Sequence, residues 1–131
     1  MEPVLDMIGI VVDDMAASLA FYRRLGFDIP EGAETQPHVE VTLRGGIRVA
    51  WDSAEMVEQF HPGFEPVKGA GRIGLSFLVD SPAEVDRRYD ELMATGYESE
   101  LKPWDAFWGQ RYAVVKDPDG NGVDLFAPLP A

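Results

Sequence analysis

The sequence predicts one mixed α+β domain made of two similar halves, each with the order strand, helix, strand, strand. A length of 131 residues suits a single domain with one sizeable core. Apolar residues occur in short runs separated by glycine and proline, and the order strand, helix, glycine is found twice. We therefore expect a single domain over residues 1–131, with a first module at about 4–60, a linker at about 61–71 and a second module at about 72–128.

The first half opens with a strand that leads into a helix. Residues 7–12 are apolar and rich in β-branched side chains, which is typical of a buried strand. Asp13 and Asp14 follow as candidate helix N-caps. Apolar residues then recur at helical spacing over 15–25, and Gly26 is a typical C-terminal stop. This half therefore begins with a strand, a helix and a glycine.

A hairpin follows in the first half. Residues 39–43 and 47–51 suit antiparallel strands, and two glycines between them favour a tight turn. A further strand is expected near residues 27–29, and residues 54–58 suit a single helical turn. The glycine- and proline-rich stretch that comes next is expected to be the linker or a lid.

The second half repeats this order. Residues 72–79 suit a strand, and Ser81 with Glu84 forms a capping-box pattern that includes proline at the first helical position. The helix is expected to end at Gly96, in the same way as the first helix ends at Gly26.

A second hairpin closes the chain. Residues 112–115 and 123–126 are expected to be its strands, with an additional strand near residues 97–101. The connection 117–122 superficially resembles a calcium loop, but its proline and the missing terminal glutamate favour a turn. We therefore interpret this connection as structural.

Charge and composition exclude several classes of function. Eleven basic and 23 acidic residues give a formal net charge of −12, which disfavours nucleic acid and anionic membranes and favours cationic ligands. The same charge also has an equally good explanation in solubility. The absence of cysteine excludes disulfides and thiolate chemistry. Because the amino terminus has neither basic residues nor a long apolar run, we expect a cytoplasmic protein.

Two motifs, one at each end of the chain, resemble a known family. Residues 10–14 together with 18–27 resemble the opening signature of glyoxalase and bleomycin-resistance proteins. Residues 108–111 and 117–125 are similar to its closing signature. The resemblance to this vicinal oxygen chelate superfamily implies two tandem βαβββ modules whose mixed sheets curl into a cup. It also implies a homodimer in which the partner completes each cup.

The same resemblance implies where a metal would bind in the enzymes of the superfamily. Their His or Glu ligands lie early in the first strand and late in the last strand of each module. In this sequence those positions are occupied by Met7, Arg48 or Ala50, Arg72 and Asp124. Among these residue types, aspartate alone offers a ligand for a hard cation. We therefore expect neither a metal nor another cofactor, and the two histidines, His38 and His61, lie outside these positions.

Aromatic residues indicate a small-molecule site instead. Trp104, Phe107 and Trp108 are expected in one loop, residues 103–109, where their faces could stack on a planar ligand. Asp124 is the candidate carboxylate for a cationic group, with Asp105, Glu40 and the overall acidity as further attraction. The residues expected to bind ligand are His38, Glu40, Trp51, Phe60, Arg72, Trp104, Phe107, Trp108, Tyr112 and Asp124.

Two alternatives remain open at these positions. Trp51 has the same strand parity as Val49, so it suits the core as well as it suits the ligand site. Arg72 suits an internal ion pair with Asp124 equally well, since buried carboxylates normally have a partner.

Three functions follow from these observations. The first is a binding protein that resembles bleomycin-resistance proteins and sequesters an aromatic or cationic antibiotic or metabolite in a dimer cleft. The second is an enzyme of the same superfamily, a lyase, isomerase or dioxygenase, that uses an off-pattern metal or a carboxylate for acid–base chemistry. The third is an interaction domain whose aromatic patch contacts another protein.

Overall fold

The computed structural model describes residues 2–67 and 73–131 and divides the chain into two compact units, Met1–Val67 and Lys68–Ala131. Unit 1 contains, in order, β1 (Met7–Val12), α1 (Met15–Arg24), the 3₁₀ helix η1 (Ala33–Thr35), β2 (His38–Thr42), β3 (Arg48–Ser53) and α2 (Ala54–Phe60). Unit 2 contains β4 (Leu75–Leu78), α3 (Pro82–Thr95), β5 (Ser99–Ala106), β6 (Gln110–Lys116) and β7 (Gly122–Pro128).

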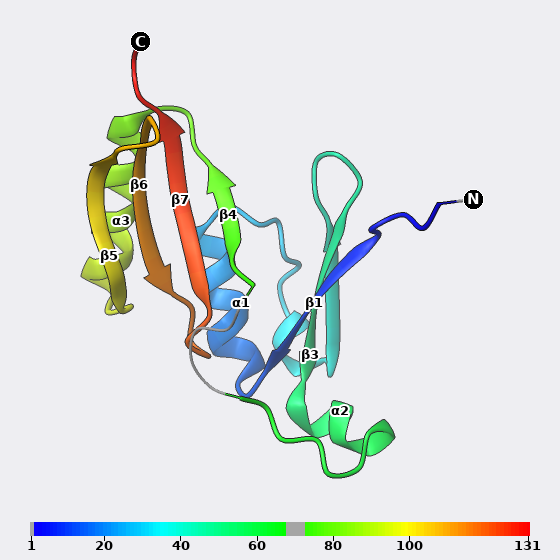
Figure 1. Ribbon diagram of the computed structural model, residues 1–131. Coiled ribbons are helices and arrows are strands. Elements are labelled where there is room, and N and C mark those ends of the chain that lie inside the picture. The colour runs from blue at the N-terminus through cyan, green and yellow to red at the C-terminus, as the bar shows by residue number, and fades with distance from the viewer. Residues whose placement is uncertain (1, 68–72) are drawn as a thin grey trace. The chain divides into compact units, whose positions relative to one another are not determined.

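Each unit has one mixed sheet, and the two sheets share a pattern (Figure 1). The strand orders are β1-β3-β2 in unit 1 and β4-β7-β6-β5 in unit 2. In both units the first strand pairs in parallel with the last strand, and the remaining neighbours pair antiparallel. This arrangement confirms the predicted α+β class and the repetition of one strand-helix-strand plan.

The helix of unit 1 starts and packs as its sequence predicts. Asp14 is the N-cap of α1, because its Oδ1 accepts a hydrogen bond of 3.1 Å from the backbone N–H of Ala17. The ring of Tyr22 lies 5.4 Å from that of Trp51 on β3, and Phe27 lies 5.7 Å from Trp51. These rings pack α1 and the segment after it against β3.

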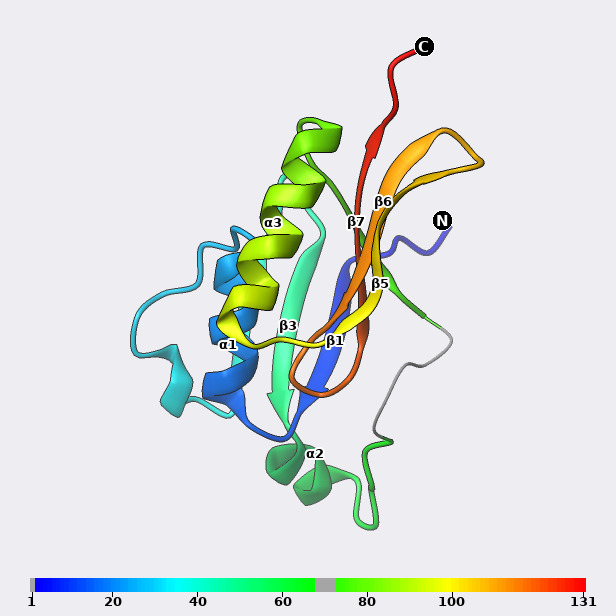
Figure 2. The same cartoon turned by 90° about the vertical axis from the view of Figure 1, so that its left-hand side faces the viewer.

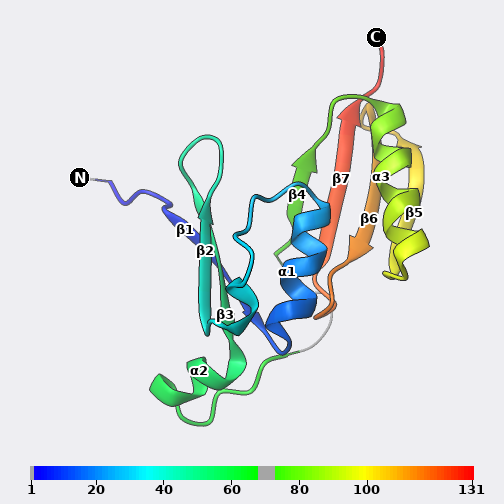
Figure 3. The ribbon, with the colours of Figure 1, turned by 180° about the vertical axis from the view of Figure 1, so that it is seen from behind.

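The helix of unit 2 shows the same agreement. Ser81 Oγ accepts a hydrogen bond of 3.2 Å from the N–H of Glu84, and Gly96 ends the helix with a φ of 104°. The helix contacts β5, β6 and β7, and Figures 2 and 3 show it lying along one face of their sheet. The carboxylate of Glu84 is bound by Arg87, so the cap forms without the reciprocal half of a capping box.

The turn between β6 and β7 is held by one side chain. Asp117 is 4% exposed, and its Oδ1 accepts hydrogen bonds from the backbone N–H groups of Asp119 (2.9 Å) and Asn121 (2.8 Å). Its Oδ2 accepts a third bond, of 2.8 Å, from Asn121 Nδ2. Because this carboxylate is occupied by the turn itself, the structural interpretation of residues 117–122 is confirmed.

Two sequence predictions about strands are wrong. Residues 27–29 form no strand, because Arg23 donates hydrogen bonds to the carbonyls of Ile29 and Pro30 (3.3 and 2.7 Å), and these carbonyls are then engaged by a side chain. The predicted loop 103–109 is largely strand, since β5 continues to Ala106. Register shifts in this edge strand accommodate Pro103.

Smaller differences concern the ends of elements. The strand expected at 72–79 begins at Leu75, and its first residue, Arg72, lies outside the described residues. The helical turn expected at 54–58 extends to Phe60 as α2. No helix within residues 2–67 and 73–131 is both long and apolar enough to cross a membrane.

Candidate functional site

The candidate site of unit 2 lies on the face of its sheet opposite α3. Arg111 on β6 donates hydrogen bonds of 3.0 and 3.2 Å to Asp86 on α3, which assigns the odd-numbered residues of β6 to the helix side. The alternate residues therefore lie on the other face. Register places on this face a set that we call the ring face: Ser76, Leu78, Trp104, Tyr112, Val114, Asp124 and Phe126.

Four aromatic rings form a connected cluster at one end of this face. Trp104 lies 5.6 Å from Trp108 and 6.4 Å from Phe107, and Phe107 lies 4.9 Å from Trp108. Trp108 also lies 5.2 Å from Tyr112, and all these contacts are edge-to-face. Such contacts hold the rings at defined angles to one another. We call Trp104, Phe107, Trp108 and Tyr112 the ring cluster.

The ring cluster is exposed to solvent and fixed in orientation. Phe107 is 89% exposed, Trp108 48% and Trp104 36%. The turn that joins β5 to β6 carries Phe107 and Trp108 and closes at Gly109, whose φ is 91°. Trp108 Nε1 donates a hydrogen bond of 2.8 Å to Gln110 Oε1, which fixes the indole. These rings therefore present apolar area that the fold does not bury.

A carboxylate adjoins the ring cluster. Ser76 Oγ donates a hydrogen bond of 2.8 Å to Asp124 Oδ2. Burial, followed by the neighbouring carboxylate of Asp124, raises the pKa of Tyr112 to about 12. In the described part of the chain no lysine or arginine forms an ion pair with Asp124. Among the described residues, the donor that holds Asp124 is therefore the neutral hydroxyl of Ser76.

The corresponding face of unit 1 has a different chemistry. Trp51 points toward Tyr22 of α1, so the alternate residues Arg48, Ala50 and Asp52 of β3 lie on the opposite face. Register adds His38 and Glu40 of β2 to this face.

These side chains form a continuous chain of charged contacts. His38 Nδ1 lies 2.5 Å from Asp52 Oδ1, and His38 Nε2 lies 2.9 Å from Glu40 Oε2. Arg48 donates to Glu40 Oε1 at 3.0 Å and to Asp6 Oδ2 at 2.5 Å. Hydrogen bonds to Asp52 and then Glu40 raise the pKa of His38 above its ordinary value, and the bond from His38 lowers the pKa of Glu40.

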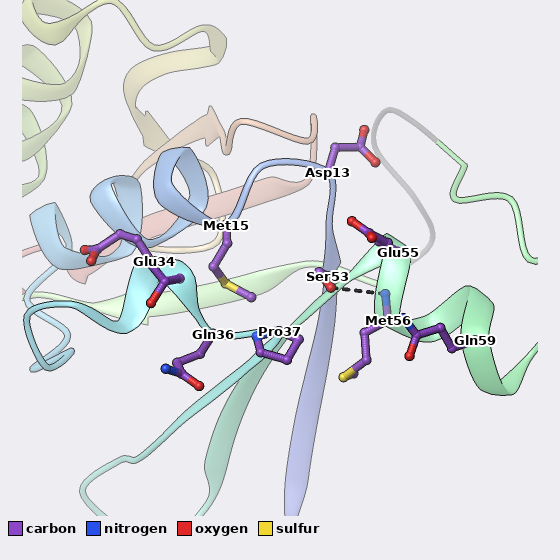
Figure 4. Close-up of a pocket in the computed structure, with 10 residues that line it drawn as sticks. Asp13, Met15, Glu34, Gln36, Pro37, Ser53, Glu55, Met56 and Gln59 are labelled. Atoms are coloured by element: carbon purple, nitrogen blue, oxygen red, sulfur yellow. Dashed lines mark hydrogen bonds between the residues drawn. The ribbon is translucent and has the colours of Figure 1, made fainter.

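Unit 1 also contains a pocket of about 380 Å³ between the start of α1, the segment around η1 and α2. Figure 4 shows Met15 of α1 and Met56 of α2 on two sides of it, with the hydrogen bond of 3.1 Å from Met56 N to Ser53 Oγ that caps α2. The polar and acidic residues in its lining include Asp13, Glu34, Gln36, Glu55 and Gln59. The pocket could accommodate a small polar group.

The structure places the predicted ligand residues in different environments. Trp104, Phe107, Trp108 and Tyr112 are brought together, Asp124 is next to Tyr112, and His38 contacts Glu40. Phe60 is 70% exposed at the end of α2, and Arg72 lies outside the described residues. Trp51 is 0% exposed and packs on Tyr22 and Phe27, which agrees with its interpretation as a core residue. Ligand binding by these residues remains a prediction.

Three polar residues next to the candidate site were not foreseen from the sequence. Ser76 holds Asp124, Gln110 holds Trp108, and Asp52 holds His38. Asp52 has the same strand parity as Arg48 and Ala50, so alternation along β3 could have identified it. Ser76 faces Asp124 through a parallel pairing between strands far apart in sequence, which has no comparable local signal.

The metal-ligand positions that the family resemblance implies do not fit a metal. Met7 is in register with Arg48, whose guanidinium is bound to Glu40 and Asp6, and Ala50 offers no donor atom. Asp124 is the one described residue of this set with a suitable oxygen. Over residues 2–67 and 73–131, no three or more His, Asp or Glu side chains form a group that could hold a metal ion.

Comparison with known proteins agrees with the fold and the motifs. The model of the Glyoxalase/Bleomycin resistance protein/Dioxygenase superfamily matches residues 4–125. This chain belongs to that superfamily. It is 30% identical over 125 residues to the uncharacterized protein YraH of Bacillus subtilis (strain 168), a match that covers 93% of this chain and 96% of that protein.

Solved structures of the superfamily share the fold. A glyoxalase/bleomycin resistance protein/dioxygenase from Nocardioides matches with a TM-score of 0.74 at 24% identity, covering 100% of this chain and 87% of that one. A glyoxalase-related enzyme from Fulvimarina pelagi has a TM-score of 0.78 at 20% identity, with 97% and 88% covered. A lactoylglutathione lyase from Agrobacterium tumefaciens has a TM-score of 0.68 at 20% identity, with 97% and 95% covered.

Proposed function

We propose that this superfamily member is a homodimeric small-molecule binding protein that sequesters an aromatic, cationic antibiotic or metabolite. The exposed ring cluster of unit 2 carries the proposal, because Phe107 is 89% and Trp108 48% exposed while their orientations are fixed by edge-to-face contacts. A planar ligand that covers these faces would remove apolar area from water and stack on oriented rings, each worth about 1 kcal/mol beyond its area.

Charge supports a cationic ligand. Asp124 is next to Tyr112 of the ring cluster, and the neutral hydroxyl of Ser76 orients its carboxylate, which forms no ion pair with a lysine or arginine of the described residues. A charge-assisted hydrogen bond from a ligand amine would add to stacking, and cations also favour aromatic faces. The formal net charge of −12 raises the local concentration of cations around the protein.

Residue chemistry supports binding over metal-dependent catalysis. The superfamily description includes both bleomycin resistance proteins and enzymes, so the family alone does not decide between them. At the implied ligand positions, Met7 and Arg48 are poor or impossible ligands for a hard cation. The exposed rings, in contrast, are suited to recognition.

Isothermal titration calorimetry with proflavine, a planar aromatic cation, tests the proposal. We expect Trp104→Ala and Trp108→Ala each to weaken binding about tenfold, which corresponds to about 1.4 kcal/mol. Leu5→Ala is the control, because Leu5 is an apolar side chain 66% exposed in unit 1 and lies outside the residues expected to bind ligand. Absence of binding for a panel of aromatic cations, or an equal loss in the control, would show that the ring cluster is not the ligand site.

Metal analysis of the purified protein tests the enzyme alternative separately. A stoichiometric divalent metal, removed by a chelator together with lyase or dioxygenase activity, would contradict the proposed function. A metal content far below one equivalent, with proflavine binding unchanged by the chelator, is the expected result.

A further inference from the structure

His38 connects two strands of unit 1 through both of its ring nitrogens. It is the first residue of β2, which lies at an edge of its sheet and is paired with β3. Its Nδ1 contacts Asp52 on β3 at 2.5 Å, and its Nε2 contacts Glu40 on its own strand at 2.9 Å. We call His38, Asp52 and Glu40 the histidine clasp.

The chemistry of the clasp depends on one proton. Ionised carboxylates only accept hydrogen bonds, so both ring nitrogens satisfy their partners only when both carry hydrogen, which is the imidazolium form. Loss of that proton leaves a nitrogen lone pair facing a carboxylate, and one bond is replaced by repulsion. Both hydrogen bonds of the clasp therefore form only when His38 is protonated.

The charged residues that face His38 can be named for each neighbouring strand. Asp52 comes from β3 and Glu40 from β2, and Glu40 is also bound by Arg48, which in turn contacts Asp6. By register, β1 contributes to this face the uncharged residues Met7, Gly9 and Val11. Protonated His38 therefore links Asp52 to the contacts among Glu40, Arg48 and Asp6.

The clasp lies at the end of β2 that leads into the pocket wall. The backbone N–H of Ser53 donates a hydrogen bond of 2.9 Å to the carbonyl of Pro37, the residue before His38. Residues 34–37 and Ser53 all belong to the lining of the pocket. A change in how the start of β2 is held against the end of β3 therefore acts on residues that line the pocket.

We propose that His38 is a proton-dependent clasp that holds the start of β2 against the end of β3 and thereby fixes the adjacent pocket wall. This device is independent of the ring cluster of unit 2. When His38 loses its proton, the start of β2 loosens and the bond between Ser53 and Pro37 opens more often.

The direction of the pH effect follows from the pKa shifts. The pKa of His38 is raised in the folded protein, so its contribution is complete below the ordinary histidine value of about 6.5 and is lost as pH rises through the raised value. The pKa of Glu40 is lowered, so its contribution is present above about 4.3 and is lost only in stronger acid. The clasp is thus complete in mildly acidic solution and weakens on the alkaline side.

Imidazole NMR and amide hydrogen exchange on the intact chain, from about pH 5.5 to about pH 9, test the proposal. We expect His38 to titrate above the ordinary histidine value of about 6.5. Protection of the Ser53 amide, corrected for the intrinsic exchange rate, should fall several-fold across the His38 titration.

Variants separate the clasp from a general effect of pH. In His38→Gln the protection of Ser53 should no longer change with pH, whereas His61→Gln should behave as the wild type. Asp52→Asn should lower the pKa of His38 while the protein remains folded. Titration of His38 at or below the ordinary histidine value of about 6.5, or an unaltered pH dependence in His38→Gln, would overturn the proposal.

Discussion

The faces of the two sheets differ in chemistry although the sheets share one plan. In unit 1 the alternate positions of β2 and β3 carry the charged chain from Asp52 through His38 and Glu40 to Arg48 and Asp6. In unit 2 the corresponding face carries rings and the carboxylate of Asp124. Because alternate residues of a strand point to opposite faces, one face can change without altering the core on the other.

The two faces also differ in how their carboxylates are compensated. Glu40 accepts from His38 and Arg48, both of which are cationic when protonated. Among the described residues, Asp124 accepts a hydrogen bond from the neutral hydroxyl of Ser76. A carboxylate that is already neutralised offers little to a ligand cation, whereas one held by neutral donors keeps its charge. Substitutions on the two faces should therefore differ in their effects on stability and on ligand binding.

The largest effect is expected from the turn that supports the ring face. Asp117→Ala removes three hydrogen bonds from the β6–β7 turn, and at about 1 kcal/mol each this lowers the free energy of unfolding by about 3 kcal/mol. Urea denaturation followed by circular dichroism measures the change. The hairpin turn of unit 1 is closed by backbone hydrogen bonds from Leu43 N–H to the Ile47 carbonyl (2.8 Å) and from Gly46 N–H to the Leu43 carbonyl (3.0 Å).

Asp90→Ala on α3 is the control for this prediction. Asp90 is exposed, and replacement of a surface helix residue changes stability by less than about 0.5 kcal/mol. If Asp117→Ala were no more destabilising than this control, the turn would owe its form to its backbone alone.

A tenfold effect is expected from the carboxylate of the ring face. Asp124→Asn should weaken binding of proflavine about tenfold and leave binding of acridone, a neutral ring system, within about twofold. Glu40→Gln should change proflavine binding by less than about twofold, because Glu40 is compensated by His38 and Arg48. Calorimetry at neutral pH gives all these values. An equal loss in the two variants would show that compensation does not distinguish the faces.

Local signals in the sequence predicted most of the fold. The N-caps Asp14 and Ser81 and the terminal Gly96 depend on side chains within a few residues, so the helices appear where expected. The strand expected at 27–29 is missing because Arg23, one turn earlier, binds the carbonyls of Ile29 and Pro30. Hydrogen bonds from a long side chain to loop carbonyls produce no periodic pattern in the sequence.

The candidate site was predictable in part. The aromatic run from Trp104 to Trp108 is visible in the sequence because its members are close neighbours, although Trp104 lies in β5 and not in a loop. The hydrogen bond from Ser76 to Asp124 joins residues 48 positions apart in the sequence and depends on the parallel register of β4 and β7. Such a register is set by the whole sheet. Trp51 fits either face by residue type, and its contacts with Tyr22 and Phe27 decide in favour of the core.

The smallest effect is expected from Tyr112, which contributes a ring to the cluster and whose hydroxyl is near Asp124. Tyr112→Phe removes the hydroxyl and keeps the ring, so the free energy of unfolding should fall by at most about 1 kcal/mol. Ser76→Ala removes the hydroxyl that donates to Asp124 and is the matched comparison. Binding of acridone should be unchanged in Tyr112→Phe, because stacking uses the ring alone. If this variant weakened acridone binding as much as Trp104→Ala does, recognition on this face would depend on the Tyr112 hydroxyl and not on stacking alone.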